Sequence, residues 1–163
     1  MILLRFGPAS AFLFASLHVL APAVALAQAG AMQRVSGAFS VTMTPAAPPV
    51  HAGCTQTGHM LLEKQYLGEL AATGTGDMLS AVTDTKGSAG YVAIERVSGA
   101  LKGRAGSFVI QHSGTMHAGV QQLSVSIVPD SGTGQLEGIE GTMTIRMVER
   151  QHFYDLDYLL PVK

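Results

Sequence analysis

The sequence has one cysteine, no tryptophan and few charged residues, and each shortage excludes a class of protein. Cys54 has no second cysteine to bond with, so no intramolecular disulfide holds the fold together. Charged residues make up 13% of the 163 residues and nearly cancel to a net charge of −1, which excludes the basic surface typical of nucleic-acid-binding proteins. Hydrophobic residues reach 47%, which is too many for a disordered chain and suits one domain with its own core.

The first 27 residues have the composition of an export signal. Arg5 precedes an almost wholly apolar run that ends in Ala25-Leu26-Ala27, the small-x-small pattern that signal peptidases cleave. An uncleaved membrane anchor is the alternative, but Pro22 and the abrupt exit into small residues favour cleavage. No later run approaches the roughly 20 apolar residues needed to span a bilayer. The sequence therefore predicts a signal peptide at 1–27 and an exported mature protein, periplasmic or secreted, with no transmembrane span.

Beyond a flexible leader expected at 28–36, apolar and polar residues alternate with the period of a half-buried β-strand. The proline-rich stretch 45–54 predicts a loop without regular structure. Residues 59–70 are ambiguous, because their apolar residues also suit a short helix. Seven or eight consecutive strands joined by short turns predict an all-β domain over 37–163, either a sandwich or a closed antiparallel barrel.

Two long stretches carry a family resemblance. They are GDMLSAVTDTKGSAGYVAIERVSGALKGRAGSFVIQHSGTM (76–116) and LSVSIVPDSGTGQLEGIEGTMTI (123–145). Both resemble the bacterial domain-of-unknown-function family 3224, over roughly residues 37–160. That family is similar to the allene oxide cyclase and dirigent barrels, which implies a single antiparallel up-and-down (meander) β-barrel of about eight strands with an internal cavity. The resemblance implies no reaction, because fold does not determine chemistry.

A polar hairpin within the first stretch is the candidate site. If Lys102-Gly103 is its two-residue turn, Glu95 faces Ile110 and lies diagonal to His112, with about 7–8 Å between their backbones. A three-residue loop would instead place Glu95 on the face of Gln111. With the two-residue turn, five side chains share one face, and if that face points into the barrel they are the expected ligand-binding residues: Tyr91, Glu95, Phe108, Ile110 and His112.

The pair Glu95 and His112 admits two interpretations. A carboxylate would favour the protonated imidazole while burial would oppose it, and such a pair could transfer protons near neutral pH. These two residues are therefore the weak catalytic candidates. The alternative is a satisfied polar pair that fixes the register of the strands. Whether the protein is an enzyme stays open.

Metal and cofactor sites are not expected. The spacing of His51, Cys54 and His59 is superficially ligand-like, but it begins in a proline-rich loop and lacks the second element that structural zinc sites normally have. The glycine-rich stretches 74–78 and 132–136 lack the Lys-Ser/Thr of a phosphate-binding loop and are interpreted as turns.

The leading functional prediction is a barrel that binds one small apolar or amphipathic ligand in its interior. An isomerase or cyclase resembling allene oxide cyclase is the alternative. A structural or interaction protein with a filled barrel is the second alternative. The sequence leaves the ligand and the oligomeric state open.

Overall fold

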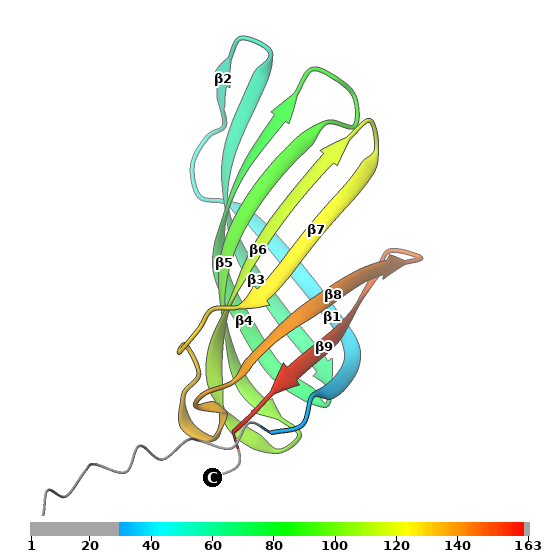
Figure 1. Cartoon of the computed structure of the whole chain (residues 1–163). Coiled ribbons are helices and arrows are strands. Elements are labelled where there is room, and N and C mark those ends of the chain that lie inside the picture. The colour runs from blue at the N-terminus through cyan, green and yellow to red at the C-terminus, as the bar shows by residue number, and fades with distance from the viewer. Residues whose placement is uncertain (1–29, 162–163) are drawn as a thin grey trace, which may run out of the picture.

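Eight long antiparallel strands close into a barrel in the computed structural model, which describes residues 30–161 (Figure 1). Each strand pairs with the next along the chain, and the first pairs with both the last and the second long strand, which closes the sheet. The long strands are β1 (Gln33–Pro45), β3 (Thr55–Gly68), β4 (Leu70–Thr83), β5 (Ala89–Leu101), β6 (Arg104–His117), β7 (Val120–Ile127), β8 (Glu140–Val148) and β9 (Gln151–Leu159). The predicted up-and-down meander of about eight strands is confirmed.

Several local expectations need correction. The loop expected at 45–54 contains a three-residue strand, β2 (Val50–Ala52), which pairs with β3 at the rim of the barrel. The helical alternative for 59–70 is wrong, because residues 55–68 form β3. The turn expected at 74–78 is also wrong, because these residues lie within β4. The first strand starts at Gln33, four residues before the expected start of the barrel, and the expected signal peptide lies outside the described residues.

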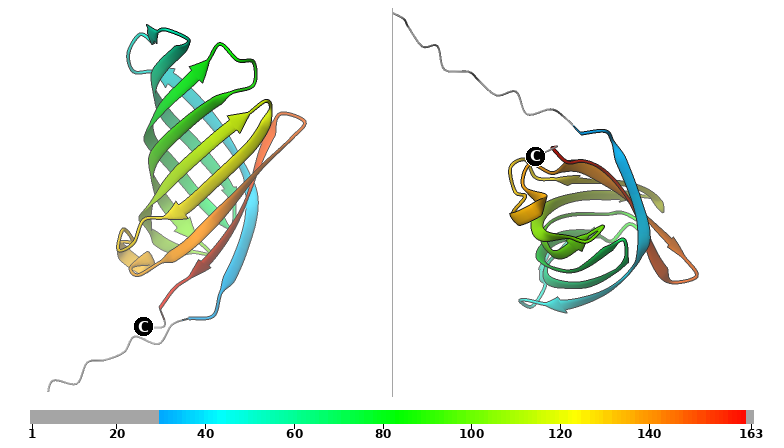
Figure 2. Two further views of the ribbon diagram at one scale, coloured as in Figure 1. Left: turned by 45° about the horizontal axis from the view of Figure 1, so that its top comes forward. Right: turned by 90° about the horizontal axis from the view of Figure 1, so that it is seen from below.

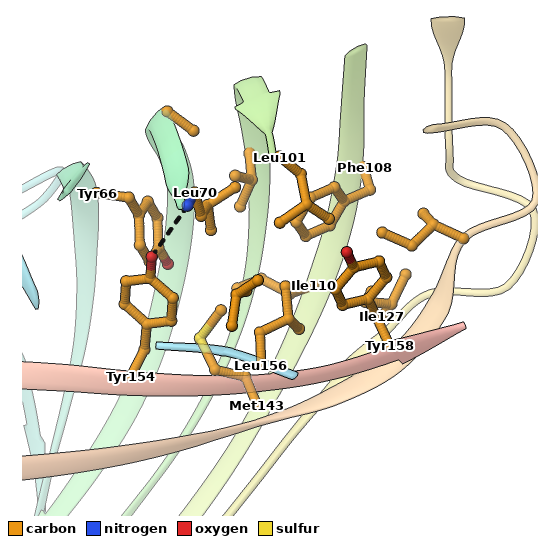
Figure 3. Close-up of a cluster of buried hydrophobic side chains, with 14 of the residues drawn as sticks. Tyr66, Leu70, Leu101, Phe108, Ile110, Ile127, Met143, Tyr154, Leu156 and Tyr158 are labelled. Atoms are coloured by element: carbon orange, nitrogen blue, oxygen red, sulfur yellow. Dashed lines mark hydrogen bonds between the residues drawn. The ribbon is translucent and has the colours of Figure 1, made fainter. Parts of the chain in front are cut away.

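One end of the barrel is filled by apolar side chains. Figure 3 shows this cluster, in which Tyr154 reaches across to β4 and its hydroxyl accepts a hydrogen bond from the backbone N–H of Leu70 at 3.2 Å. The connection between β7 and β8 contains a short 3₁₀ helix, η1 (Gly134–Leu136), and buries Leu136 and Ile139 against the same cluster. This end therefore resembles an ordinary packed protein core.

The other end of the barrel is less complete. Strands β7 and β8 share a single residue pair, Ser126 with Thr142, whereas β8 pairs with β9 along its whole length. The β8–β9 hairpin consequently diverges from β7 (Figures 1 and 2). Two methionines at this end are exposed, Met43 by 52% and Met147 by 68%. The barrel thus has a packed end and an open end.

The described residues, 30–161, contain no helix that is long and apolar enough to cross a membrane.

Candidate ligand-binding site

The predicted hairpin between β5 and β6 has the expected turn and register. Lys102 and Gly103 both have positive φ angles, of 49° and 78°, as a type I′ two-residue turn requires. Glu95 consequently pairs with Ile110, and Ala93 with His112. Side chains alternate between the two faces of a strand, so Glu95 and His112 both point into the barrel. This confirms the register on which the candidate site depended.

Glu95 is the centre of a buried polar cluster. Its side chain has no exposed surface, and its two carboxylate oxygens accept hydrogen bonds from different partners on β3. Lys64 Nζ donates to Oε2 at 2.6 Å, and the Tyr66 hydroxyl donates to Oε1 at 2.8 Å. Lys64 also approaches the Tyr66 oxygen at 3.4 Å. The carboxylate is therefore compensated by a buried ammonium group and held in place on both oxygens.

A glycine on β4 makes room for this carboxylate. Gly74 lies between Lys64 on β3 and Val97 on β5 in the pairing of the three strands. A Cβ atom at Gly74 would lie 2.0 Å from Glu95 Oε1, much closer than any real contact. The glycine within a strand thus marks a close approach by a neighbouring group. The glycine at position 74 is therefore accounted for by packing within a strand and not by a turn.

Lys64 and Tyr66 were not among the residues expected at the site. The spacing of apolar residues around them fits a helix as well as a strand, so the sequence does not settle which way Lys64 points. The signal that could have identified them is a pair of small residues on β4 that face the barrel interior. Gly74 is the strand partner of Lys64, and Ala72 is the strand partner of Tyr66. Small residues opposite two long polar ones indicate a space that the longer side chains fill.

The electrostatics of the cluster favour an ionised Glu95 and a neutral Tyr66. Burial pushes the pKa of Glu95 upward, but the contacts with His112, Lys64 and Tyr66 outweigh it and hold the pKa below its usual range. Burial, together with the negative charge of Glu95, raises the pKa of the Tyr66 phenol far above its usual value. Tyr66 therefore remains a hydrogen-bond donor at neutral pH.

His112 is the incompletely satisfied member of the cluster. Its Nε2 atom lies 3.2 Å from Glu95 Oε2, but the two groups are not aligned for a hydrogen bond. Nε2 is sealed from solvent and has no hydrogen-bond partner within residues 30–161. The polar group beside Nε2 is therefore the Glu95 carboxylate, and a buried nitrogen with one misaligned contact is uncommon in folded proteins.

A cavity of about 370 Å³ lies above the cluster, toward the open end of the barrel. Its volume falls within the range of small-molecule sites. Lys64 and His112 lie at its polar end, and the Lys64 ammonium is 5.0 Å from the centre of the Phe39 ring. The ring of His152 stacks on the same Phe39 ring, with 5.0 Å between the two ring centroids. The remaining lining residues are Val41, Met43, Leu62, Met78, Tyr91, Gln121, Leu123, Ile145 and Met147.

The five residues expected to bind a ligand occupy different places. Tyr91 and His112 line the cavity. Glu95 lies behind Lys64 and His112, and Phe108 and Ile110 belong to the packed cluster at the closed end. The structure therefore brings Glu95 and His112 together, while their roles in binding or catalysis remain predictions.

The residues weighed as metal ligands do not form a cluster. Within residues 30–161, no three His, Cys, Asp or Glu side chains are arranged to hold a metal ion. His59 Nε2 instead lies 2.7 Å from Asp77 Oδ1 on the outer surface, and Cys54 is free and exposed.

Comparisons with known proteins identify the family of this barrel. The family described as Protein of unknown function (DUF3224) matches residues 35–158. A crystal structure of a protein with unknown function from that family, from Shewanella oneidensis MR-1, is similar with a TM-score of 0.78 and 46% sequence identity, over 82% of this chain and 100% of that chain. No curated protein matches the sequence. The likeness to allene oxide cyclase barrels stays a prediction, but the family match spans most of the barrel, and the chain belongs to the DUF3224 family.

Proposed function

We propose that this protein binds a small apolar or amphipathic molecule in the cavity at the open end of the barrel. The observation that carries the proposal is the cavity of about 370 Å³ with the buried His112, beside Glu95, at its polar end. Apolar walls with a few convergent polar groups are the usual composition of a small-molecule site. A filled barrel would offer no such space, so the cavity favours binding over a purely structural role.

The separation of β7 from β8 supports the proposal by giving a ligand a route inward. Leu123 on β7 and Ile145 on β8 line the cavity from the two sides of this separation. Exposed Met147 lies beside it on β8. Methionine is flexible and polarizable, so it adapts to ligands of different shape.

A second hollow on the outside of the barrel supports binding less well. It has a volume of about 610 Å³ and lies beneath the segment that contains Pro48 and Val50. Its walls include Leu79 and Val92, each more than half exposed. A ligand there would remain largely in water and would gain little from apolar burial.

Binding is tested with the neutral fluorescent probe N-phenyl-1-naphthylamine. We expect saturable fluorescence enhancement by the wild type and its loss in Leu123→Trp, because the larger side chain fills the cavity. Leu67→Trp is the matched control, since Leu67 is 57% exposed on the outside of β3. Equal binding by both folded variants, as checked by their unfolding curves, would place the probe elsewhere. Absence of binding by the wild type would contradict the proposal.

The natural ligand is sought by native mass spectrometry of the protein purified from its own source. A co-purifying mass that is present in the wild type and absent from Leu123→Trp would identify the occupant of the cavity.

A further inference from the structure

At the polar end of the cavity a hydrogen-bond donor faces the ligand space, while the acceptor, the Glu95 carboxylate, is buried behind it. Both oxygens of Glu95 are occupied, and its side chain is fully buried behind the cavity lining. Lys64 has three N–H groups, of which one points to Glu95 and one to the Tyr66 oxygen. The third N–H has no partner within residues 30–161, and the ammonium lines the cavity. A ligand that reaches this end therefore meets an ammonium donor and an imidazole ring.

The walls between this end and the mouth are mainly apolar. Val41, Leu62 and Leu123 supply apolar wall, and the two lining methionines Met43 and Met147 are exposed to solvent. A molecule that matches a polar end and mainly apolar walls has a hydrogen-bond-accepting group at one end and a hydrocarbon body behind it. The accepting group would lie innermost.

The charges of the cluster are balanced before a ligand arrives. The ionised Glu95 carboxylate compensates the Lys64 ammonium, with 2.6 Å between Oε2 and Nζ. An anionic headgroup would bring one negative charge into a buried site, which is costly unless it is compensated. Protonation of a ring nitrogen of His112 by solvent would restore the balance and provide the headgroup with a second cationic donor.

Other titratable groups near His112 differ in whether they can accept that proton. They are Lys64 and Tyr66 on β3, Tyr91 and Glu95 on β5, and His152 on β9. Burial raises the pKa of Tyr91 and of Tyr66, so both phenols are already protonated at neutral pH. The contacts of Glu95 hold its pKa low, so it stays ionised. His152, which stacks on Phe39, is the alternative acceptor and must be tested separately.

We propose that the ligand is an acidic amphiphile whose carboxylate lies against Lys64 and His112, and that its binding is coupled to the uptake of one proton by His112. The inference rests on the proposed function and specifies the chemistry of the same site.

Calorimetric titration of the full chain with decanoate, decanol and decylamine tests the headgroup. At pH 6 we expect decanoate to bind at least tenfold more tightly than decanol, and decylamine to bind most weakly because its charge repels Lys64. Decanol binding as tightly as decanoate would overturn the acidic headgroup and leave the proposed function intact. Failure of all three probes, and of the neutral fluorescent probe, would overturn both.

The coupling of binding to proton uptake is tested by varying the pH and the buffer. Proton-coupled binding makes the decanoate affinity fall between pH 6 and pH 8, by up to about tenfold per pH unit, while decanol affinity stays constant. Titrations in buffers of different ionisation enthalpy measure the proton uptake directly. We expect His112→Gln to abolish the uptake and His152→Gln to retain it. Uptake that persists in His112→Gln, or zero uptake by the wild type, would overturn the coupling.

Discussion

The two ends of this barrel use the same alternating strands for different purposes. On β6, Phe108 and Ile110 are completely buried in the apolar cluster at the closed end. Two residues further along the same face, His112 lies at the cavity, and Met116 near the end of the strand is 37% exposed. The difference shows that strand pairing alone does not produce a core. A core also needs side chains that fill the interior and a neighbouring strand that completes the wall.

The polar cluster separates the two ends. Glu95, Lys64 and Tyr66 form hydrogen bonds across β3 and β5 between the apolar cluster and the cavity. Buried charges are tolerated here because each has a partner of opposite charge. The closed end can therefore supply stability while the open end keeps space for a ligand.

The largest expected loss of stability comes from removing the charge of Glu95 in the polar cluster that separates the two ends. Glu95→Gln leaves the Lys64 ammonium buried without a counter-charge, and we expect a loss of about 3–5 kcal/mol in the free energy of unfolding at pH 7. Urea denaturation measures it. Glu69→Gln is the matched control, because Glu69 pairs with Lys102 on the surface at 3.6 Å and both side chains are about half exposed. Equal, small losses in both variants would show that the buried pair does not hold the two ends together.

Replacing one isoleucine by alanine at each end compares how tightly the two ends are packed. Ile110→Ala removes a completely buried side chain from the closed end, and we expect it to cost about 2–5 kcal/mol. Ile145 also points inward, but it is only partly buried and lines the cavity, so Ile145→Ala should cost less than half as much. Unfolding curves of the two variants give the ratio. A ratio near one would mean that the open end is packed as tightly as the closed end.

A smaller effect is expected where a glycine admits the Glu95 carboxylate. Gly74→Ala places a methyl group 2.0 Å from Glu95 Oε1, so the carboxylate must shift away from its partners. We expect a loss of about 1–3 kcal/mol, as for other overpacked sites. Gly90→Ala on β5 is the control, since the nearest atom to its new Cβ would be 3.7 Å away, and we expect a change within about 0.5 kcal/mol. Similar losses would point to a general cost of alanine in these strands.

The hairpin of β5 and β6 was predictable because its register depends on local geometry. Once a two-residue turn at Lys102 and Gly103 is assumed, every later pair is fixed, so the shared face of Glu95 and His112 follows from that one assumption. Which face of the hairpin points into the barrel did not follow from the turn, because it depends on the other strands.

The other half of the cluster was not predictable by the same reasoning. Leu62, Tyr66 and Leu70 are spaced four residues apart, which satisfies both the helical period and the strand period of two. The contact of Lys64 with Glu95 joins β3 to β5 across β4, so it depends on the closed barrel rather than on one turn. The separation of β7 from β8 likewise results from how the whole barrel closes, and no local pattern indicates it.

The smallest expected effect is at the rim of the open end, where Cys54 lies between β2 and β3. Its side chain is free and exposed, and its sulfur has one weak contact, with the Thr55 hydroxyl at 3.8 Å. The neighbouring backbone hydrogen bond, from Asp84 N–H to the Cys54 carbonyl, does not depend on the side chain. Cys54→Ser should therefore change the free energy of unfolding by no more than about 0.5 kcal/mol and leave probe binding unchanged. A larger loss in thermal or urea unfolding would show that the rim contributes to the stability that we assign to the closed end.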